Sequence, residues 1–174
     1  MKKNIILLTL LLFVSFLMAQ NTIEKSVISD NNLTKIILLR HAEKVLDKTK
    51  DPILTDEGKK RAERLRFLFS DIKIDKIFSS PYIRTKMTVA DLAKSKSLQV
   101  EDYDPKDLNF AKYLLEKEQG KTIVVVGHSN TTPILVNKLI GEDKFSQLSE
   151  DVYSKLWILT FSNETLIDCS LFNF

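Results

Sequence analysis

The sequence predicts a three-layer α/β domain, in which a mostly parallel central sheet has helices on both faces and ends in an edge hairpin. Three observations support this fold class. Short apolar runs alternate four times with segments whose apolar residues recur at helical spacing. The C-terminal part instead contains two strand-like runs around Ser162, Asn163 and Glu164, as in a hairpin. The chain has 174 residues, of which 44% are hydrophobic, and this is enough for one domain with its own core.

The strands are predicted from short runs of aliphatic and aromatic residues. The clearest is TIVVV at residues 122–126, a continuous apolar run typical of a strand that is buried on both faces. The four runs that alternate with helices lie at 35–39, 76–78, 98–103 and 122–126, and the hairpin strands lie at 155–161 and 165–172.

A segment with helical spacing of apolar residues follows each of the first four runs. In the first of these segments, Ala62, Leu65 and Phe69 share one face. The last segment is apolar almost all round, which indicates a well-buried helix. The helices are predicted over residues 55–69, 81–94, 107–117 and 133–140.

Basic side chains follow three of the four parallel strands at the points where these strands end. Arg40 and His41 follow the first strand, Arg84 comes shortly after the second, and His128 follows the fourth. Both histidines of the chain and two of its five arginines therefore lie at strand exits. Because ligands of open parallel sheets bind beyond the carboxyl ends of the strands, we expect these four side chains to lie close together.

Two pairs of residues predict where the neighbouring helices begin. Ser80 before Pro81, and Thr132 before Pro133, have the pattern of an N-cap followed by proline at the first helical position. Arg84 then lies near the first turn of its helix. Two helix N-termini at the same edge of the sheet would also favour an anion.

A cluster of two histidines and two arginines is costly to bury unless a strongly anionic ligand binds to it. Arginine donates to phosphate oxygens bidentately, which lysine cannot do. The cluster therefore favours a site that handles a phosphate group. Two histidines without a third consistent ligand make a poor metal site, so the sequence predicts no metal and no other cofactor.

Four motifs resemble those of the histidine phosphatase superfamily, which has the phosphoglycerate-mutase-like fold. They are RHAE at Arg40–Glu43, LTDEG at Leu54–Gly58, SSPYIR at Ser79–Arg84 with Thr88 four residues further on, and GHS at Gly127–Ser129. They come in the family's order, and the resemblance implies a short single-domain member. Gly58 costs about 1 kcal/mol relative to alanine in a helix, and the resemblance implies a packing reason for it.

The resemblance implies that His41 is the nucleophile, which is phosphorylated transiently on a ring nitrogen. It also implies that Arg40, Arg84 and His128 hold the phosphoryl oxygens. A cationic clamp stabilises charge in the transition state, and an imidazole with an ordinary pKa of about 6.5 is neutral enough to attack near neutral pH. His128 is expected to keep its proton and to act as a further cation. The predicted substrate-binding residues are Arg40, Arg84, His128, Ser129 and Asn130.

The reaction also needs a carboxyl group that protonates the leaving oxygen and later activates water. In the longer members of the family, this carboxylate follows the third strand. Here residues 100–107 contain four acidic residues and no clear match to the family's motif. Asp104, held in a turn by Pro105, is the predicted donor, and Glu43, two residues after His41, is the alternative.

The N-terminus has the layout of a cleaved secretory signal peptide. Lys2 and Lys3 precede an apolar run from Ile5 to Met18, and the small residue Ala19 comes before polar residues. An uncleaved membrane anchor is the alternative, for which this run is short. The predicted signal peptide, polar leader and catalytic domain span residues 1–19, 20–33 and 34–174. Such a protein is periplasmic or secreted, without stable membrane association after cleavage.

Charge and cysteine content exclude two further classes. Loss of Lys2 and Lys3 lowers the formal charge from +3 to +1, which provides no electrostatic case for binding nucleic acid. Cys169 is the only cysteine, so no internal disulfide framework is expected. It is interpreted as a small buried hydrophobe in a late strand.

The sequence therefore predicts an exported phosphatase that hydrolyses small-molecule phosphate monoesters through a phosphohistidine on His41. A phosphomutase and a phosphohistidine phosphatase are alternatives within the family. The short connections of the chain leave little material for the inserted segments that shield a mutase phosphoenzyme, and export separates a phosphohistidine phosphatase from cytoplasmic partners. A non-catalytic phosphate-binding module is the alternative from another class.

Overall fold

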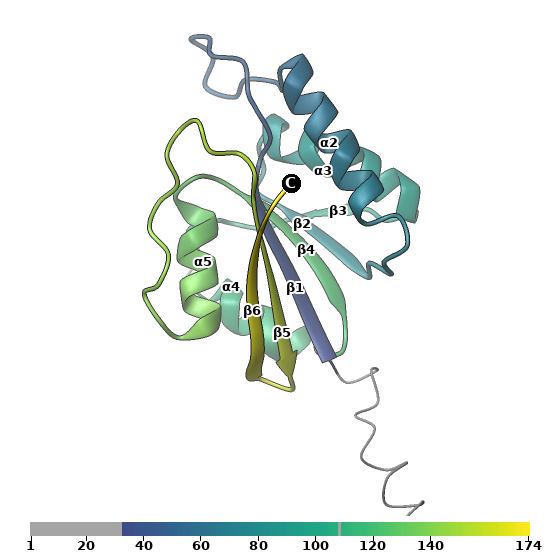
Figure 1. Ribbon diagram of the computed structural model, residues 1–174, viewed down its shortest axis with the longest axis vertical. Coiled ribbons are helices and arrows are strands. Elements are labelled where there is room, and N and C mark those ends of the chain that lie inside the picture. Colours follow the sequence, from purple (N-terminus) through teal and green to yellow (C-terminus); the bar gives the residue numbers. More distant parts are fainter. Residues whose placement is uncertain (1–32, 108) are drawn as a thin grey trace, which may run out of the picture. The chain divides into compact units, whose positions relative to one another are not determined.

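The computed structural model describes residues 33–107 and 109–174, which form a six-stranded sheet flanked by helices (Figure 1). The strands are β1 (Leu33–Arg40), β2 (Lys76–Ser79), β3 (Val100–Asp102), β4 (Thr122–Gly127), β5 (Lys155–Ser162) and β6 (Thr165–Asn173). The helices are α2 (Asp56–Leu68), α3 (Ile83–Lys96), α4 (Phe110–Lys117) and α5 (Thr131–Ile140). The predicted signal peptide and residues 20–32 of the predicted leader lie outside the described residues.

The strand order is β3-β2-β4-β1-β5-β6. The first four strands of the chain are parallel, since β4 pairs in parallel with β1 and β2, and β2 pairs in parallel with β3. β5 is antiparallel to β1, and β6 pairs with β5 as an antiparallel hairpin at the edge. The predicted α/β class and the C-terminal edge hairpin are therefore confirmed. The carboxyl ends of β1, β2 and β4 meet at one edge of the sheet.

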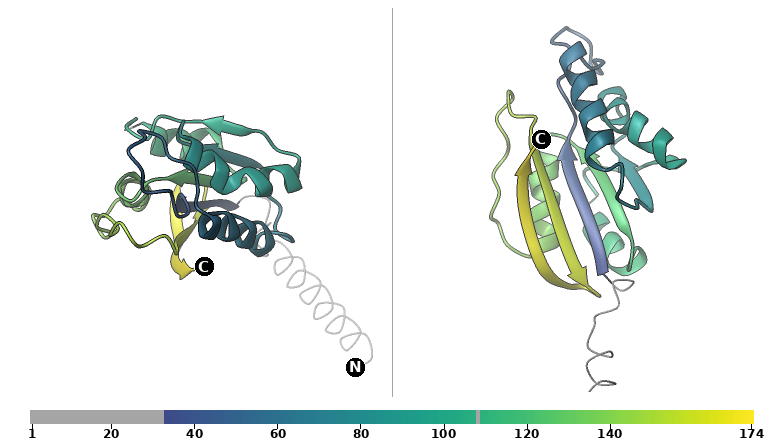
Figure 2. Two further views of the ribbon diagram at one scale, coloured as in Figure 1. Left: turned by 90° about the horizontal axis from the view of Figure 1, so that it is seen from above. Right: turned by 45° about the vertical axis from the view of Figure 1, so that its right-hand side comes forward.

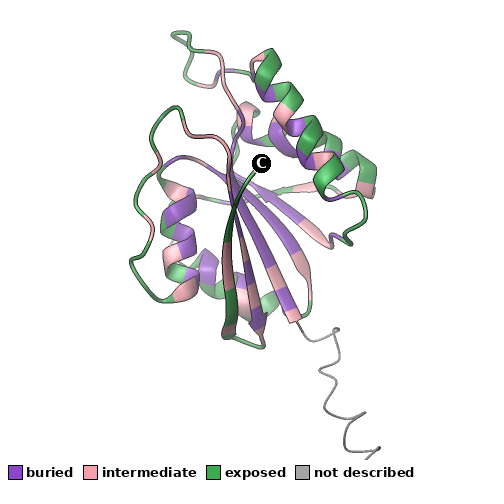
Figure 3. Ribbon diagram, viewed as in Figure 1, coloured by how far each residue is buried: buried purple, intermediate pink, exposed green. Residues whose placement is uncertain are grey.

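The helices form the outer two layers, with α2 and α3 on one face of the sheet and α4 and α5 on the other (Figure 2). A hydrophobic core lies on each face of the sheet. Side chains of a strand point alternately to opposite faces, so alternate residues of β1 pack into the two cores. Ile37 and Leu39 pack with residues of α2 and α3, whereas Ile36 and Leu38 pack with residues of α4 and α5. Figure 3 shows β1 and β4 largely buried and β6 largely exposed.

The two predicted N-caps are wrong. The N-cap of α3 is Tyr82, because the chain stays extended through this residue, and the hydroxyl of Ser80 instead contacts Thr85 and His128. α5 begins at Thr131, where the side chain of Asn130 accepts a hydrogen bond from the Thr131 amide over 2.9 Å.

α4 begins at Phe110, three residues after the predicted start at Asp107. The side chains of Asp104 and Asp107 each accept a hydrogen bond from the backbone amide two residues further on. Such local turns compete with helical hydrogen bonding and delay the start of the helix. Cys169, predicted to be buried, is half-buried on β6 against the core on the α4 and α5 side.

The position of α2 explains why residue 58, in the second motif, is a glycine. The hydroxyl of Thr55 accepts from the Gly58 amide over 3.1 Å and caps the helix. A Cβ atom at Gly58 would collide with the backbone carbonyl of Glu43, just beyond the exit of β1. The expected packing reason is therefore present: the glycine lets α2 approach the segment that carries His41.

Within residues 33–107 and 109–174, no helix is long and apolar enough to cross a membrane.

Candidate active site

The exits of β1, β2 and β4 open into a cavity of about 360 Å³. Its lining includes all four basic residues of the predicted cluster. Lys44 and Lys106 add two more cations, and Glu150 is the one carboxylate among the described residues that line the cavity. The cavity is therefore strongly cationic. Its lining residues include Arg40, His41, Tyr82, Arg84, His128, Ser129, Asn130 and Glu150.

His41 directly follows β1 and is 3% exposed. Its backbone amide donates to the carbonyl oxygen of Gly127 over 3.0 Å, which ties it to the end of β4. The ring atom Nδ1 lies 2.8 Å from the carbonyl oxygen of Ala42. A carbonyl can only accept, so Nδ1 carries the proton and Nε2 keeps a free lone pair. Burial, reinforced by the charge of Arg40, lowers the pKa of His41 to about 3, and the ring is therefore neutral near pH 7.

Arg40 is almost completely buried, and the segment before β5 surrounds it. Its Nη1 atom donates to the carbonyl oxygens of Ser149 and Val152, both over 2.9 Å. Its Nη2 atom donates to Glu150 over 3.1 Å, and the guanidinium carbon lies 4.1 Å from the ring centre of Tyr153. These contacts hold the guanidinium rigidly at the cavity.

Arg84 lies in the first turn of α3, as expected, and Asp51 orients it. Its Nη1 atom donates to the carboxylate of Asp51 over 3.1 Å. The same carboxylate accepts from the backbone amide of Ile83 and so occupies the N-terminus of α3. Nη2 of Arg84 lies 3.3 Å from Nδ1 of His128. The second arginine is therefore fixed between a loop carboxylate and the second histidine.

His128 lies close to His41, with ring centres 5.5 Å apart. Because Arg84 donates to its Nδ1, the ring proton lies on Nε2, which contacts the hydroxyl of Ser80 over 2.9 Å. Burial and the charges of Arg84 and Arg40 lower the pKa of His128 to about 4. The expectation that His128 keeps a positive charge is therefore wrong for this arrangement: the ring is a neutral donor and acceptor between Arg84 and Ser80.

Two arginine nitrogen atoms are buried without a partner. Nε of Arg40 and Nε of Arg84 have no hydrogen-bond partner within the described part of the chain. Both arginine side chains also line the cavity, where guanidinium groups suit an oxyanion.

Ser129 and Asn130, the other predicted binding residues, also line the cavity. The hydroxyl of Ser129 donates to Glu150 over 3.0 Å, whereas the side chain of Asn130 caps α5. Within residues 33–107 and 109–174, no group of three or more His, Cys, Asp or Glu side chains is arranged to hold a metal ion.

The structure does not bring Asp104 into the cavity with His41. Its carboxylate accepts from the Lys106 amide over 2.9 Å, and it lines a neighbouring, more apolar cavity. The physical reason is local, because an aspartate two residues before a free amide closes its own turn.

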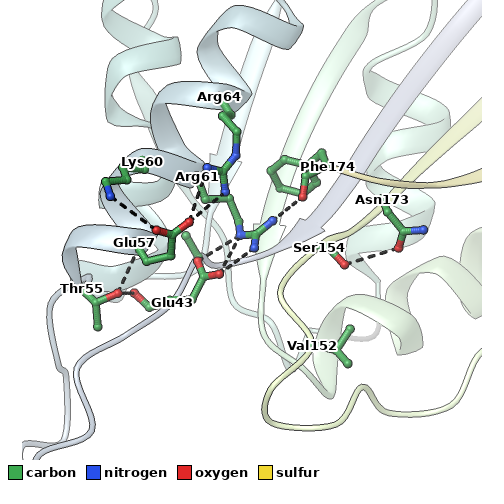
Figure 4. Close-up of polar contacts among 12 residues, drawn as sticks. Glu43, Thr55, Glu57, Lys60, Arg61, Arg64, Val152, Ser154, Asn173 and Phe174 are labelled. Atoms are coloured by element: carbon green, nitrogen blue, oxygen red, sulfur yellow. Dashed lines mark hydrogen bonds and ion pairs between the residues drawn. The ribbon is translucent and has the colours of Figure 1, made fainter.

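Glu43 also lies outside the lining of the cavity, although it is two residues from His41. Figure 4 shows its carboxylate paired with Arg61 of α2, which reaches Glu43 over 2.7 Å and also donates to the carbonyl oxygen of Phe174. Although burial raises the pKa of Glu43, the hydrogen bonds from Arg61 hold it below its ordinary value. Glu43 contacts Arg61 instead of lining the cavity with His41, so the geometry supports neither of the two predicted donors.

Asp51, Glu150 and Tyr153 take part in the site and were not predicted from the sequence. They lie in connecting segments without a periodic pattern, and only the folded chain brings them to the strand exits. No signal in the sequence distinguishes Glu150 from the acidic residues around it.

Comparison with known proteins agrees with the motifs and the fold. Residues 36–105 match the family model of the histidine phosphatase superfamily (branch 1). Phosphoserine phosphatase 1 of Hydrogenobacter thermophilus is 38% identical over 74 residues, which are 39% of this chain and 35% of that protein. The matched part thus spans about a third of the length of this relative.

Solved structures share the fold at low sequence identity. The protein histidine phosphatase SixA, solved with tungstate, has a TM-score of 0.64 and 17% identity, with 80% of this chain and 96% of that chain covered. A phosphoserine phosphatase of Entamoeba histolytica, solved with 3-phosphoglyceric acid, has a TM-score of 0.63 and 18% identity, with coverage of 81% and 97%. Residues 36–105 are therefore similar to the histidine phosphatase superfamily (branch 1), and the chain shares its fold with these solved phosphatases.

Proposed function

We propose that this protein is a phosphatase that hydrolyses phosphate monoesters of small molecules through a phosphohistidine on Nε2 of His41. One observation carries the proposal: a buried, neutral histidine presents a free Nε2 lone pair to a cavity that it shares with two rigidly held arginines. The phosphatase names of the relatives also support it.

The clamp is formed by Arg40 and Arg84, and His128 positions Arg84 by accepting from its Nη2 atom. Both arginines line the cavity, and their guanidinium groups would share the phosphoryl oxygens. Their charge offsets the repulsion between the phosphate dianion and the attacking lone pair, and it stabilises charge in the transition state. Ser129 and Asn130, both predicted as binding residues, are part of the proposed site because they line the same cavity.

The nucleophile needs no base, because its pKa of about 3 leaves Nε2 unprotonated near neutral pH. Attack on phosphorus forms a P–N bond and expels the alcohol, and water then cleaves that bond. Covalent capture divides one difficult hydrolysis into two easier steps.

An exported location is part of the proposal and rests on residues 1–19. The intact mass of the protein recovered from outside the cytoplasm tests it. A mass that lacks residues 1–19 supports cleavage after Ala19, whereas a mass that retains them contradicts it.

The test of the activity is release of p-nitrophenolate from p-nitrophenyl phosphate by residues 20–174, compared with His41→Ala, between pH 4 and 8. We expect turnover by the unmodified chain and its loss in His41→Ala. Inhibition by inorganic phosphate, followed in the same assay, reports the clamp separately.

If neither protein turns over the substrate while phosphate still binds, the proposal is wrong and the chain is a phosphate-binding module. If His41→Ala is as active as the unmodified protein, the proposed nucleophile is wrong. Unfolding curves of both proteins establish that the variant is folded.

A further inference from the structure

The segment between α5 and β5 folds over the exit of β1 (Figure 1). Arg40 and Ser129 anchor this segment. Arg40 donates to the carbonyl oxygens of Ser149 and Val152. The carbonyl oxygen of Ser129 accepts from the Leu148 amide over 2.9 Å. All of these contacts join parts of the chain that are far apart in sequence. The segment is therefore fixed against the catalytic strands.

This anchoring places Glu150 at the cavity. Its Oε2 atom accepts from Nη2 of Arg40 over 3.1 Å, and its Oε1 atom accepts from the hydroxyl of Ser129 over 3.0 Å. The side chain is 70% exposed, so the carboxylate faces open solvent in the cavity rather than the core. Each oxygen atom retains a lone pair for a further partner.

A simple ion pair does not account well for this arrangement. The backbone carbonyls of Ser149 and Val152 already satisfy Nη1 of Arg40 and hold it in place. An exposed carboxylate beside a phosphate clamp also competes with the substrate, which is a cost for a site that binds anions. A role in the chemistry would offset that cost.

We infer that Glu150 is the proton donor and acceptor of the proposed reaction, an inference that rests on the proposed phosphatase function. It occupies the same cavity as His41, whereas Asp104 is held in its own turn and Glu43 is paired with Arg61. Ser129 and Arg40 orient the carboxyl group through one oxygen each, and the remaining lone pair of each oxygen is left for proton transfer.

The steps balance with this assignment. Nε2 of His41 forms a bond to phosphorus as the P–O bond to the leaving group breaks, and the electron pair stays on the leaving oxygen, which takes the proton of Glu150. A water molecule then attacks phosphorus, gives its proton to the Glu150 carboxylate, and the P–N electron pair returns to Nε2. The products are an alcohol and inorganic phosphate, and both side chains are restored.

The test compares Glu150→Gln with the unmodified protein on two substrates. One is p-nitrophenyl phosphate, whose leaving group is stable as an anion, and the other is a simple alkyl phosphate, whose leaving group must be protonated. We expect kcat/KM to fall about 100-fold for the alkyl phosphate and less than about fivefold for the aryl phosphate. A burst of p-nitrophenolate should precede slow turnover, because the variant cannot activate water and the phosphoenzyme accumulates.

Asp151→Asn is the matched control, since it removes one charge from the neighbouring, exposed position. It should leave both rates unchanged. A Glu150→Gln variant that lowers kcat/KM equally for both substrates, or for neither, would overturn the inference while the activity of the unmodified protein and its loss in His41→Ala keep the proposed function intact. Turnover that survives His41→Ala overturns both.

Discussion

Nδ1 of His41 lies 2.8 Å from the carbonyl oxygen of Ala42, the next residue in the chain, and this contact determines which ring nitrogen can react. The imidazole must donate there, so its lone pair is confined to Nε2. A backbone contact orients the proposed nucleophile, and its orientation does not depend on a partner side chain.

The first prediction concerns the charge of the two histidines. Because burial, together with nearby arginines, lowers the pKa of His41 to about 3 and that of His128 to about 4, neither ring should take up a proton between pH 8 and 5. Nitrogen-15 NMR of the imidazole rings measures this directly, and the chain has only two histidines to assign. A midpoint near 6.5 for either ring would contradict the described geometry.

The second prediction is that the lowered pKa values of the two histidines make the free energy of unfolding depend on pH. In the unfolded chain both histidines have ordinary pKa values near 6.5, so below that pH the unfolded state binds more protons than the folded state. The free energy of unfolding should therefore fall as the pH decreases from 6.5 to 5, by about 1 kcal/mol per pH unit for each histidine. Chemical denaturation across this range measures the slope.

The variant His128→Asn checks this prediction. It should lower the slope of unfolding free energy against pH by about half, because one of the two histidines is removed. The carboxyl groups with lowered pKa values, such as Glu43 and Glu118, contribute in the same direction but at lower pH, because their ordinary values are about 4.5. An unchanged slope in His128→Asn would show that the ring has the same pKa in the folded and unfolded chain, which contradicts the prediction.

The third prediction concerns Arg84→Lys, which keeps the charge and loses the planar guanidinium. Lysine cannot contact Asp51, His128 and a phosphoryl oxygen together as arginine does. Inhibition by inorganic phosphate or orthovanadate should weaken by about tenfold or more, since hydrogen bonds from charged groups are worth about 1.5–3 kcal/mol. Arg64→Lys on the exposed face of α2 is the control and should leave inhibition unchanged.

The fourth prediction concerns Gly58→Ala. Alanine favours a helix by about 1 kcal/mol, but here its Cβ atom meets the backbone carbonyl of Glu43. Overpacking should dominate and lower the free energy of unfolding by about 1–3 kcal/mol, as measured by urea denaturation. Lys60→Ala, at an exposed position of the same helix, should change it by less than about 0.5 kcal/mol. Stabilisation by Gly58→Ala would contradict the close approach of α2.

The fold class could be predicted from the sequence because local pattern determines it. Buried parallel strands must be apolar throughout, and the helices that cover them must carry an apolar stripe, so the alternation is visible without tertiary information. The positions of Arg40, His41, Arg84 and His128 followed from the same pattern, since the carboxyl ends of parallel strands meet at one edge.

The helix starts and the charge of His128 could not be predicted from the sequence pattern. They depend on which hydrogen bonds each side chain forms in the folded chain. Asn130, rather than Thr132, caps α5, and the side chain of Asp104 closes a turn instead of reaching the cavity. His128 is neutral because Arg84 donates to it in a buried setting, which a motif does not reveal.

The sequence alone thus determined the sheet, its layers and the basic residues at its edge, because these depend on periodicity and strand direction. Only the tertiary structure placed Glu150 beside Arg40, a contact between residues 110 positions apart. The segment that carries Glu150 has no periodic pattern, and its position follows from hydrogen bonds to the end of β1 and the turn before α5. Contacts of this kind exist only once the strands have paired, and the carboxylate of the site therefore comes from folding rather than from a motif.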